Sequence, residues 1–292
     1  MQRRSDEEAR RELSARVDAL HRGRPRVWSL VITFFGDAVV PRGGEVWLGV
    51  VAELMEHLGV NPGTLGAAMS RLTAEGWLER SKVGRRSHYR LAESGRQTFD
   101  AAMLRVYGLD EASWTGQWSL HLTDRPDATA WASAGFGRLA PDVFVRPERG
   151  DAPPVPARSS ESVFSPDPAD APAFAARAYP LDASETRHAD FVGAFRGLTQ
   201  ALRSGRRLVG GDAMAARTLL VHAYRRVVLK DPVLPRAARL PGTSADEARR
   251  LVGELYQRLL AESEAWLDAQ GEDGALRPPG PRFFERFGGL FP

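Results

Sequence analysis

Five basic side chains lie between Arg80 and Arg90 with no acidic residue among them, and phosphate binding is the chemistry that such a run can perform. Arginine and lysine contact the phosphates of a nucleic acid and set the register of a protein on it without reading its sequence. The run contains Gly84 and is flanked by segments that alternate apolar and polar residues, which is typical of a hairpin. Two interpretations stay open: a contact with nucleic acid, or a solvated hairpin edge.

The segment just before the basic run, residues 61–75, has the pattern of a helix that can approach base edges. Asn61 suits the N-cap, Pro62 the first helical position and Gly76 the end of the helix. Leu65, Ala68, Met69 and Leu72 form one apolar face, and the opposite face carries small or polar side chains. The residues predicted to contact DNA, from this helix and the basic run together, are Thr64, Ala67, Ser70, Arg71, Arg80, Lys82, Arg85, Arg86 and His88.

The neighbouring elements must position that helix. The predicted elements are a helix over 26–35, a loop over 36–44, a helix over 47–58 that ends at Gly59, strands over 77–80 and 88–91 around the turn 81–87, and a helix over 96–107. The short link at residues 59–61 is that of a helix-turn-helix. We therefore predict a winged helix-turn-helix domain over residues 26–109 with double-stranded DNA as its partner.

Composition narrows the class of protein. The chain has 292 residues, enough for two or three domains, and 43% of them are hydrophobic. The absence of cysteine excludes disulfides and thiolate chemistry and favours a cytoplasmic location. No apolar run is long enough to cross a membrane, and residues 1–25 are a charged segment expected to be a solvated helix or disordered. The net charge of +3 is modest, so DNA affinity must depend on where the charges lie.

The middle of the chain, residues 112–181, predicts a small α+β domain. Residues 114–123 are a predicted strand, 127–139 a helix and 142–146 a second strand, which resembles the first half of a ferredoxin-like fold. The segment 150–173 is rich in proline and is expected to be a loop or insertion. Residues 174–181 are the predicted returning strand.

The last third, residues 182–276, predicts a helical domain. Capping-box patterns begin at Asp182 and Ser244, and a helix is expected from about Ala213 to Leu229. The tail, 277–292, holds proline and four phenylalanines, which would be costly to expose together, so we expect it to dock on its own protein or on a partner. The fold class predicted for the whole chain is α+β.

Catalytic patterns are missing from the sequence. The six histidines do not form a metal-ligand spacing, and no phosphate-binding glycine loop or nucleophile motif occurs, so we expect neither an enzyme nor a catalytic or metal site. His222, beside two arginines, is best interpreted as a hydrogen-bonded structural residue. Two alternatives stay open: a metal-dependent nuclease built around Asp124, and a DNA-binding module without sequence specificity.

Four segments of the chain carry a family resemblance: SLVITFFGDAVVPRGGEVWLG (29–49), MSRLTAEGWLERSKVGRRSHYRL (69–91), GFGRLAPDVFVRP (135–147) and LLVHAYRRVVLKDPVLP (219–235). Together they resemble the PaaX-type transcriptional repressors, which control phenylacetic acid degradation. The resemblance implies an N-terminal winged helix, a ferredoxin-like middle domain and a helical C-terminal domain. It also implies a homodimer that binds an operator and releases it when an aryl-acetyl-CoA thioester binds, with no other cofactor.

If the effector is a CoA thioester, we expect arginine and aromatic side chains away from the DNA to bind it. The candidate effector-binding residues are Trp114, Trp118, Arg146, His222, Arg225 and Arg226. The arginines have an alternative role in ion pairs within the protein. The chain departs from the family at Gly66, where we expect an arginine, and in the proline-rich segment, so the effector need not be phenylacetyl-CoA itself.

Overall fold

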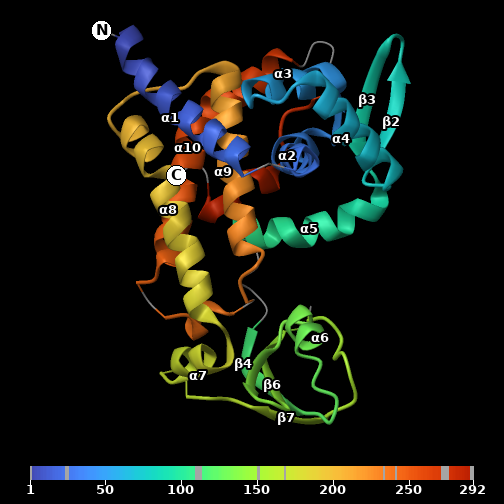
Figure 1. Cartoon of the computed structure of the whole chain (residues 1–292), viewed down its shortest axis with the longest axis vertical. Helices are drawn as coiled ribbons and strands as arrows, with labels where there is room; N and C mark the ends of the chain where they lie inside the picture. Colours follow the sequence, from blue (N-terminus) through green and yellow to red (C-terminus); the bar gives the residue numbers. More distant parts are fainter. Residues whose placement is uncertain are drawn as a thin grey trace. The chain divides into compact units, whose positions relative to one another are not determined.

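The computed structural model describes residues 2–23, 26–108, 114–149, 152–167, 169–232, 234–240, 242–270 and 276–289. Helices combine with two antiparallel sheets, so the predicted α+β class is confirmed (Figure 1). The chain forms two compact units, residues 1–109 with 190–229 and 248–292, and residues 110–189 with 230–247. The predicted domain boundaries stay predictions, and the one near residues 109–112 lies outside the described residues.

The first unit begins with the elements that surround the predicted DNA-reading helix. They are α1 (Gln2–Arg22), α2 (Val27–Phe34), a π turn (Phe35–Val39), a 3-10 turn (Val40–Arg42), β1 (Glu45–Trp47), α3 (Leu48–His57), α4 (Pro62–Ala74), β2 (Leu78–Val83), β3 (Arg86–Leu91) and α5 (Glu93–Tyr107). The three strands form one antiparallel sheet in the order β1-β3-β2. The helices and the two hairpin strands occur in the order that the sequence predicts, whereas β1 was not predicted.

The long C-terminal helices complete this unit: α9 (Gly210–Val228) and the larger parts of α8 (Leu181–Arg203) and α10 (Ser244–Ala269). Helix α9 packs against α1, α2, α3 and α5. Because it has neighbours on several sides, most of its residues are buried, including a charged one, Arg217. A single apolar core therefore extends from Leu30 and Leu54 to Leu220 and Leu255. Burial of this shared core is the main force holding the helices together.

Three predictions in this unit were wrong. Residues 2–22 are not solvated on all sides: Ala9 and Leu13 are buried in the core, because apolar residues recur every four along α1. Residues 35–42 are not an open loop but continue as π and 3-10 turns. The turn predicted over 81–87 is strand except for Gly84 and Arg85, because cross-strand pairing extends from Leu78 to Val83.

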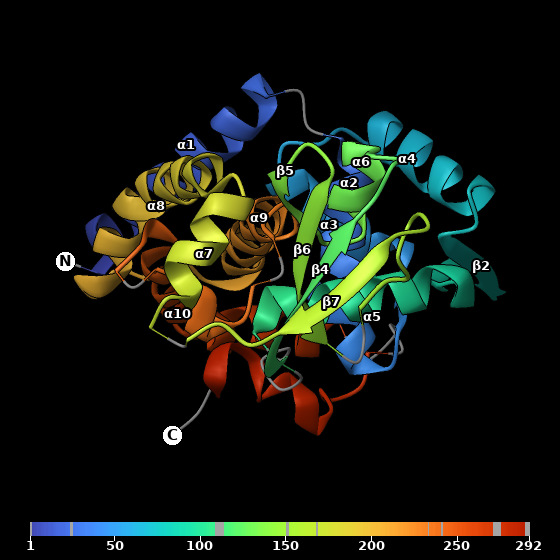
Figure 2. The ribbon, with the colours of Figure 1, turned by 90° about the horizontal axis from the view of Figure 1, so that it is seen from below.

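The second unit contains a four-stranded antiparallel sheet in the order β5-β6-β4-β7, whose longer strands β6, β4 and β7 lie side by side in Figure 2. The strands are β4 (Trp114–Leu122), β5 (Gly137–Ala140), β6 (Val143–Arg149) and β7 (Ser160–Phe164), with the helices α6 (Ala128–Ser133) and α7 (Ala171–Ala178). In the register, Trp118 lies opposite Pro147 and Phe164, and Ser119 lies opposite Arg146 and Val163. Because side chains alternate along a strand, Trp118 and Arg146 lie on opposite faces of the sheet.

The second half of this unit differs from prediction. The proline-rich segment is not wholly a loop, since β7 lies within it and pairs with β4. Residues 174–181 are not a returning strand: α7 occupies most of that segment, because its alanines pack beneath Trp118 in a compact core. The predicted helix over 127–139 ends at Ser133, after which the chain enters β5.

The tail, named here for the described residues 276–289, folds back onto the first unit. Its 3-10 turns are Pro281–Phe283 and Arg286–Gly288. Phe283 and Arg286 are buried, so the expectation that the tail docks on its own protein is confirmed for these residues, while Phe291 lies outside the described range. Over the described part of the chain, we find no helix both long enough and apolar enough to cross a bilayer.

Candidate nucleic-acid interface

The turn between α3 and α4 places the second helix of the pair. Gly59 adopts a left-handed conformation with φ of +69°, and Val60 donates its N–H to the carbonyl of Met55 at 2.8 Å. The Asn61 side chain then accepts the backbone N–H of Thr64 at 2.9 Å, which confirms the predicted N-cap. A cap of this kind satisfies a donor that the first helical turn leaves unpaired.

Helix α4 buries one face and presents the other to solvent. The predicted apolar positions Leu65, Ala68, Met69 and Leu72 are all buried. The predicted contact residues on the other face, Thr64, Ala67, Ser70 and Arg71, are all exposed. Arg71 forms an ion pair with Glu75 at 2.7 Å, so part of its charge is balanced within the helix. What remains is a narrow, nearly neutral ridge of small side chains, which suits close approach to base edges.

The hairpin that follows α4 carries the basic run. Gly84 adopts a left-handed φ of +62° in the turn, a conformation that glycine adopts without steric cost. Val83, beside the turn, is 62% exposed. The cations of the hairpin are not equivalent, because several are engaged by neighbouring side chains.

Arg80 and Arg86 are held on the hairpin, whereas Lys82 and Arg85 extend from it. Arg80 donates to Ser87 Oγ at 2.7 Å, and the guanidinium carbon of Arg86 lies 4.7 Å from the centroid of the Trp47 ring. Arg86 is correspondingly half-buried, whereas Arg80, Lys82 and Arg85 are exposed. Arg90, at the base of the hairpin, pairs with Glu79 at 2.6 Å. Lys82 and Arg85 are therefore the cations best placed to meet a phosphate.

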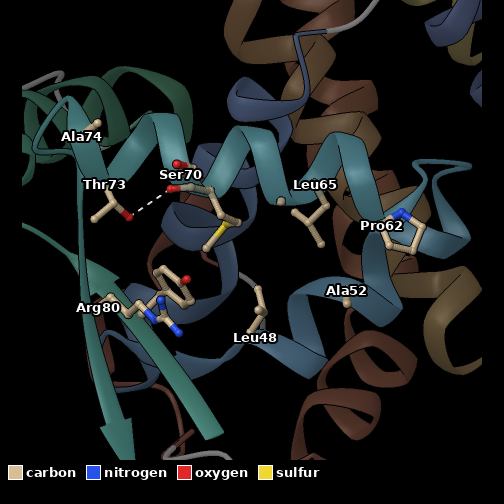
Figure 3. Close-up of a pocket in the computed structure, with 11 residues that line it drawn as sticks. Leu48, Ala52, Pro62, Leu65, Ser70, Thr73, Ala74 and Arg80 are labelled. Atoms are coloured by element: carbon tan, nitrogen blue, oxygen red, sulfur yellow. Dashed lines mark hydrogen bonds between the residues drawn. The ribbon is translucent and has the colours of Figure 1, made fainter.

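A groove of about 550 Å³ lies between α4, the start of α3 and the hairpin (Figure 3). Its lining is Leu48, Ala52, Pro62, Leu65, Gly66, Met69, Ser70, Thr73, Ala74, Arg80 and Tyr89. In Figure 3, Arg80 reaches from β2 into the space beside α4, and the Thr73 hydroxyl donates to the Met69 carbonyl at 2.9 Å. The groove has an apolar floor, with Ser70 and Arg80 among its polar groups. This concave surface has no signal in the sequence, because Leu48 and Tyr89 belong to elements that only folding brings beside α4.

His88 differs from the other predicted contact residues because it is only 4% exposed. It lies in the central strand of the sheet, opposite Trp47 on one side and Ser81 on the other. A side chain with so little exposed surface is not available to contact DNA. We therefore leave His88 out of the proposed interface.

The candidate effector residues of the second unit occupy different environments. Trp114 is half-buried and donates to the Gln117 carbonyl at 2.9 Å, while Trp118 is fully buried in the core under α7. Arg146, on the opposite sheet face from Trp118, donates to the carbonyls of Ala134 and Pro153 at 3.1 and 2.6 Å. Burial lowers the pKa of Arg146. The structure does not bring Trp118 and Arg146 together.

The candidate effector residues of the first unit lie on α9. His222 is buried and its Nδ1 lies 3.1 Å from the Thr33 hydroxyl, in agreement with a structural role. Burial, reinforced by Arg225 and Arg226, lowers the pKa of His222 to about 3, so the imidazole is neutral at physiological pH. Arg225 donates to the Ser29 carbonyl at 3.1 Å, and burial lowers its pKa to about 10, whereas Arg226 is exposed. His222 and Arg225 thus fasten α9 to α2.

No group of three histidine, aspartate or glutamate side chains within the described ranges could hold a metal ion. The geometry of α3, α4 and the cationic hairpin is instead typical of proteins that bind duplex DNA through a helix-turn-helix. Comparison with known proteins agrees with this class. A family described as PaaX-like protein matches residues 26–95, and one described as PaaX-like protein C-terminal domain matches residues 179–269.

The transcriptional repressor PaaX of Escherichia coli (strain K12) is 33% identical over 284 residues, which cover 90% of each chain. The chain therefore belongs to the PaaX-like family, which confirms the resemblance predicted from the sequence. A solved structure, the uncharacterized protein Rv0674 from Mycobacterium tuberculosis, is similar with a TM-score of 0.50 and 19% identity. The match covers 75% of this chain and 90% of that one, and it indicates a shared fold alone.

Proposed function

We propose that this chain is a transcriptional repressor that binds duplex DNA through a winged helix-turn-helix formed by α2 to β3. The observation that carries the proposal is the exposed ridge of small side chains on α4 beside the exposed cations Lys82 and Arg85. The 33%-identical relative is named a transcriptional repressor, which supports the same role here. Helix α4 would enter the major groove, and the hairpin would contact the backbone.

The binding mode follows from the architecture of helix-turn-helix proteins. Two copies of the chain, as a homodimer, would place their α4 helices in successive major grooves about 34–36 Å apart and read a pseudo-palindromic operator. Thr64, Ser70 and Arg71 would contact base edges or phosphates, and Arg80, Lys82 and Arg85 would contact phosphates. A repressor of this kind acts where the DNA is, in line with the predicted cytoplasmic location.

We further propose that an aryl-acetyl-CoA thioester releases the operator, as the family resemblance implies. A ligand can do so only if it binds the DNA-incompetent conformation more tightly than the competent one. Among the six candidate residues, Arg226 is exposed and Trp114 is half-buried, so these two are the best candidates for contact with a ligand. The other four are held in the core or in internal hydrogen bonds, which supports the alternative that they are structural: Trp118, Arg146, His222 and Arg225. The ferredoxin-like interpretation of the second unit also remains a proposal.

Family membership confirms the prediction that the chain is not an enzyme, because the matched relative is a transcriptional repressor. The nuclease alternative rested on Asp124 alone. That residue lies on the surface between β4 and α6. No specific observation favours a second function.

Binding of the purified chain to its own promoter region and to a scrambled duplex, at one fixed salt concentration, tests the function. The proposal expects tighter binding to the promoter by at least about a thousandfold, which is typical of specific DNA recognition. Addition of phenylacetyl-CoA tests the effector separately. Release of the promoter would support a thioester effector, and unchanged binding would contradict it. Equal binding of both duplexes would contradict sequence-specific repression.

A further inference from the structure

A fully buried carboxylate, Asp37, lies at the centre of a polar network that the proposed function does not use. Its side chain accepts the Arg217 Nε–H at 2.6 Å, the Arg286 Nη1–H at 3.0 Å and the Tyr256 hydroxyl at 2.8 Å, and it also accepts the Tyr107 hydroxyl. Burial opposes ionisation, but the two guanidinium groups and the two hydroxyls hold the pKa of Asp37 below its ordinary value. Asp37 is therefore a buried anion with a full set of donors.

The network extends from Asp37 to the protein surface. Arg217 also pairs with Glu264, which in turn accepts Arg42 Nη2 at 2.6 Å, and Arg42 reaches the exposed Asp268 at 2.8 Å. Three guanidinium groups thus balance three carboxylates. Buried ion pairs contribute little net stability compared with an apolar replacement, but a misplaced partner leaves a costly unpaired charge. Such a network favours one geometry strongly over its neighbours.

The members of the network come from segments on either side of α3, α4 and the hairpin. Asp37 and Arg42 belong to the entry segment, named here for residues 35–44, which leads from α2 into β1 and α3. Tyr107 ends α5, the helix that follows the hairpin. The segment before α3 and the helix after the hairpin therefore meet at the same carboxylate. Arg217, Tyr256 and Glu264 hold that carboxylate or its neighbours from α9 and α10.

The tail closes the network. The N–H groups of Arg277 and Gly280 donate to the carbonyls of Arg42 and Pro41 at 2.9 and 3.1 Å, so the tail runs along the entry segment. Arg286 then donates to the Asp37 carbonyl at 2.9 Å as well as to its carboxylate, and its guanidinium carbon lies 4.0 Å from the centroid of the Tyr107 ring. Arg286 therefore contacts both the entry segment and the end of α5.

Phe287, the residue after Arg286, has an unfavourable backbone conformation that the packing around the tail maintains. Phe287 has a φ of +56°, a left-handed conformation that is uncommon for an aromatic residue. Its ring packs against Tyr107 and Tyr256, with centroids 5.2 Å apart in each case. Unfavourable backbone conformations of this kind persist only where the surroundings over-determine them.

We propose that the tail is a strap and that Arg286 is a positioning residue for DNA recognition. By contacting both Asp37 and Tyr107, Arg286 sets the orientation of α3 and α4 relative to α9 and α10. When Arg286 no longer contacts Asp37 and Tyr107, the exposed cations of the hairpin stay in place, but the α4 side chains are displaced from base edges. This inference rests on the proposed DNA-binding function, and it predicts a loss of specificity rather than of general affinity.

The experiment compares affinities for the promoter duplex and a scrambled duplex, at fixed salt, in the full-length chain and three variants. Arg286→Ala should lower the ratio of the two affinities by about tenfold or more, because displaced α4 side chains lose contacts with base edges, while affinity for the scrambled duplex stays unchanged. Arg286→Lys should restore part of the ratio. Arg282→Ala, which removes an exposed cation from the same tail, is the matched control and should change neither affinity.

Equal loss of affinity for both duplexes in a folded Arg286→Ala protein would overturn the positioning role, because the ratio of the two affinities would then be unchanged. Unchanged affinity for both duplexes in that protein would overturn it too. If that variant does not fold, Tyr107→Phe removes one hydroxyl donor to Asp37 and keeps the ring, and it should lower the ratio in the same direction. Equal binding of both duplexes by the unchanged chain would remove the proposed specific function and this inference with it.

Discussion

The guanidinium of Arg86 lies over the indole ring of Trp47, 4.7 Å from its centroid, and this contact joins β3 to the residue that precedes α3. A cation held on an aromatic face is partly withdrawn from other partners. The two adjacent arginines of the hairpin, Arg85 and Arg86, therefore have different roles: one extends into solvent and the other ties the hairpin to the helix-turn-helix.

Replacement of Lys82 or Arg85 by alanine should weaken DNA binding about equally for all sequences. Each lost phosphate contact should also flatten the dependence of log affinity on log salt concentration by about 0.9. Binding titrations of each variant from low to moderate salt measure this slope. Arg86→Ala is the comparison and should change the slope less. An unchanged slope in the Lys82 and Arg85 variants would show that the hairpin does not meet phosphates.

Asn61→Ala should destabilise the protein by about 1 kcal/mol, because the Thr64 N–H loses its side-chain acceptor at the start of α4. The free energy of unfolding, measured by urea denaturation, gives the size of the effect. Asn61→Asp keeps an acceptor at the cap and should cost much less. If the alanine and aspartate variants are equally stable, the cap does not contribute.

Gly59→Ala should be clearly destabilising. The residue has a φ of +69°, and an added Cβ would lie 2.9 Å from the His21 ring nitrogen Nε2, which contacts the Leu58 carbonyl at 2.8 Å. Gly66→Ala is the matched control, because Gly66 lies inside α4 with no atom near an added Cβ, and alanine there should stabilise the helix by about 1 kcal/mol. Thermal unfolding of the two variants should therefore shift in opposite directions.

Gly66→Arg restores to α4 the arginine that the family resemblance leads us to expect at this position. Gly66 is exposed and lines the groove beside α4, and an added Cβ would meet no atom within 4 Å. The added cation should raise DNA affinity and steepen the salt dependence by about one phosphate contact. Binding of the variant to promoter and scrambled duplexes separates a gain in general affinity from a change in sequence preference. Unchanged binding to both would place this position away from the DNA.

His222 should make stability depend on pH. The folded protein binds a proton at this imidazole only near pH 3, because its pKa is lowered to about 3, whereas in the unfolded chain the group titrates near its ordinary value of about 6.5. Between these values the unfolded state binds more protons, so stability falls as the pH decreases, by about 2 kcal/mol at pH 5. Urea unfolding at pH 7 and pH 5 measures the fall. The fall should be smaller in His222→Gln, and an equal fall in both proteins would contradict this assignment.

Local patterns predicted helix α4 well. The N-cap at Asn61, the buried face of α4 and the exposed contact positions are set within one stretch of sequence by hydrogen-bond chemistry and helical period, so they could be recognised without the fold. The basic run was also recognised, but not the division between held and exposed cations. That division depends on Trp47 and Glu79, which strand pairing brings beside Arg86 and Arg90.

The second unit shows where local patterns failed. Residues 174–181 contain aromatic and alanine residues that suit a strand or a short helix, and packing against Trp118 decides in favour of α7. The strand β7 has few apolar residues and is recognisable only through its pairing with β4. Such segments have weak intrinsic preferences, so their neighbours in space determine their conformation.

The sequence by itself determined the class of protein: a cysteine-free α+β chain of the PaaX-like family with a capped helix and a basic hairpin. Periodicity, capping and charge are local properties, so they can be recognised without knowledge of the fold. Only the tertiary structure decided which groups act together. Asp37, Arg217 and Arg286 lie up to 249 residues apart, yet they share one buried site, because a buried charge requires partners wherever the chain can supply them.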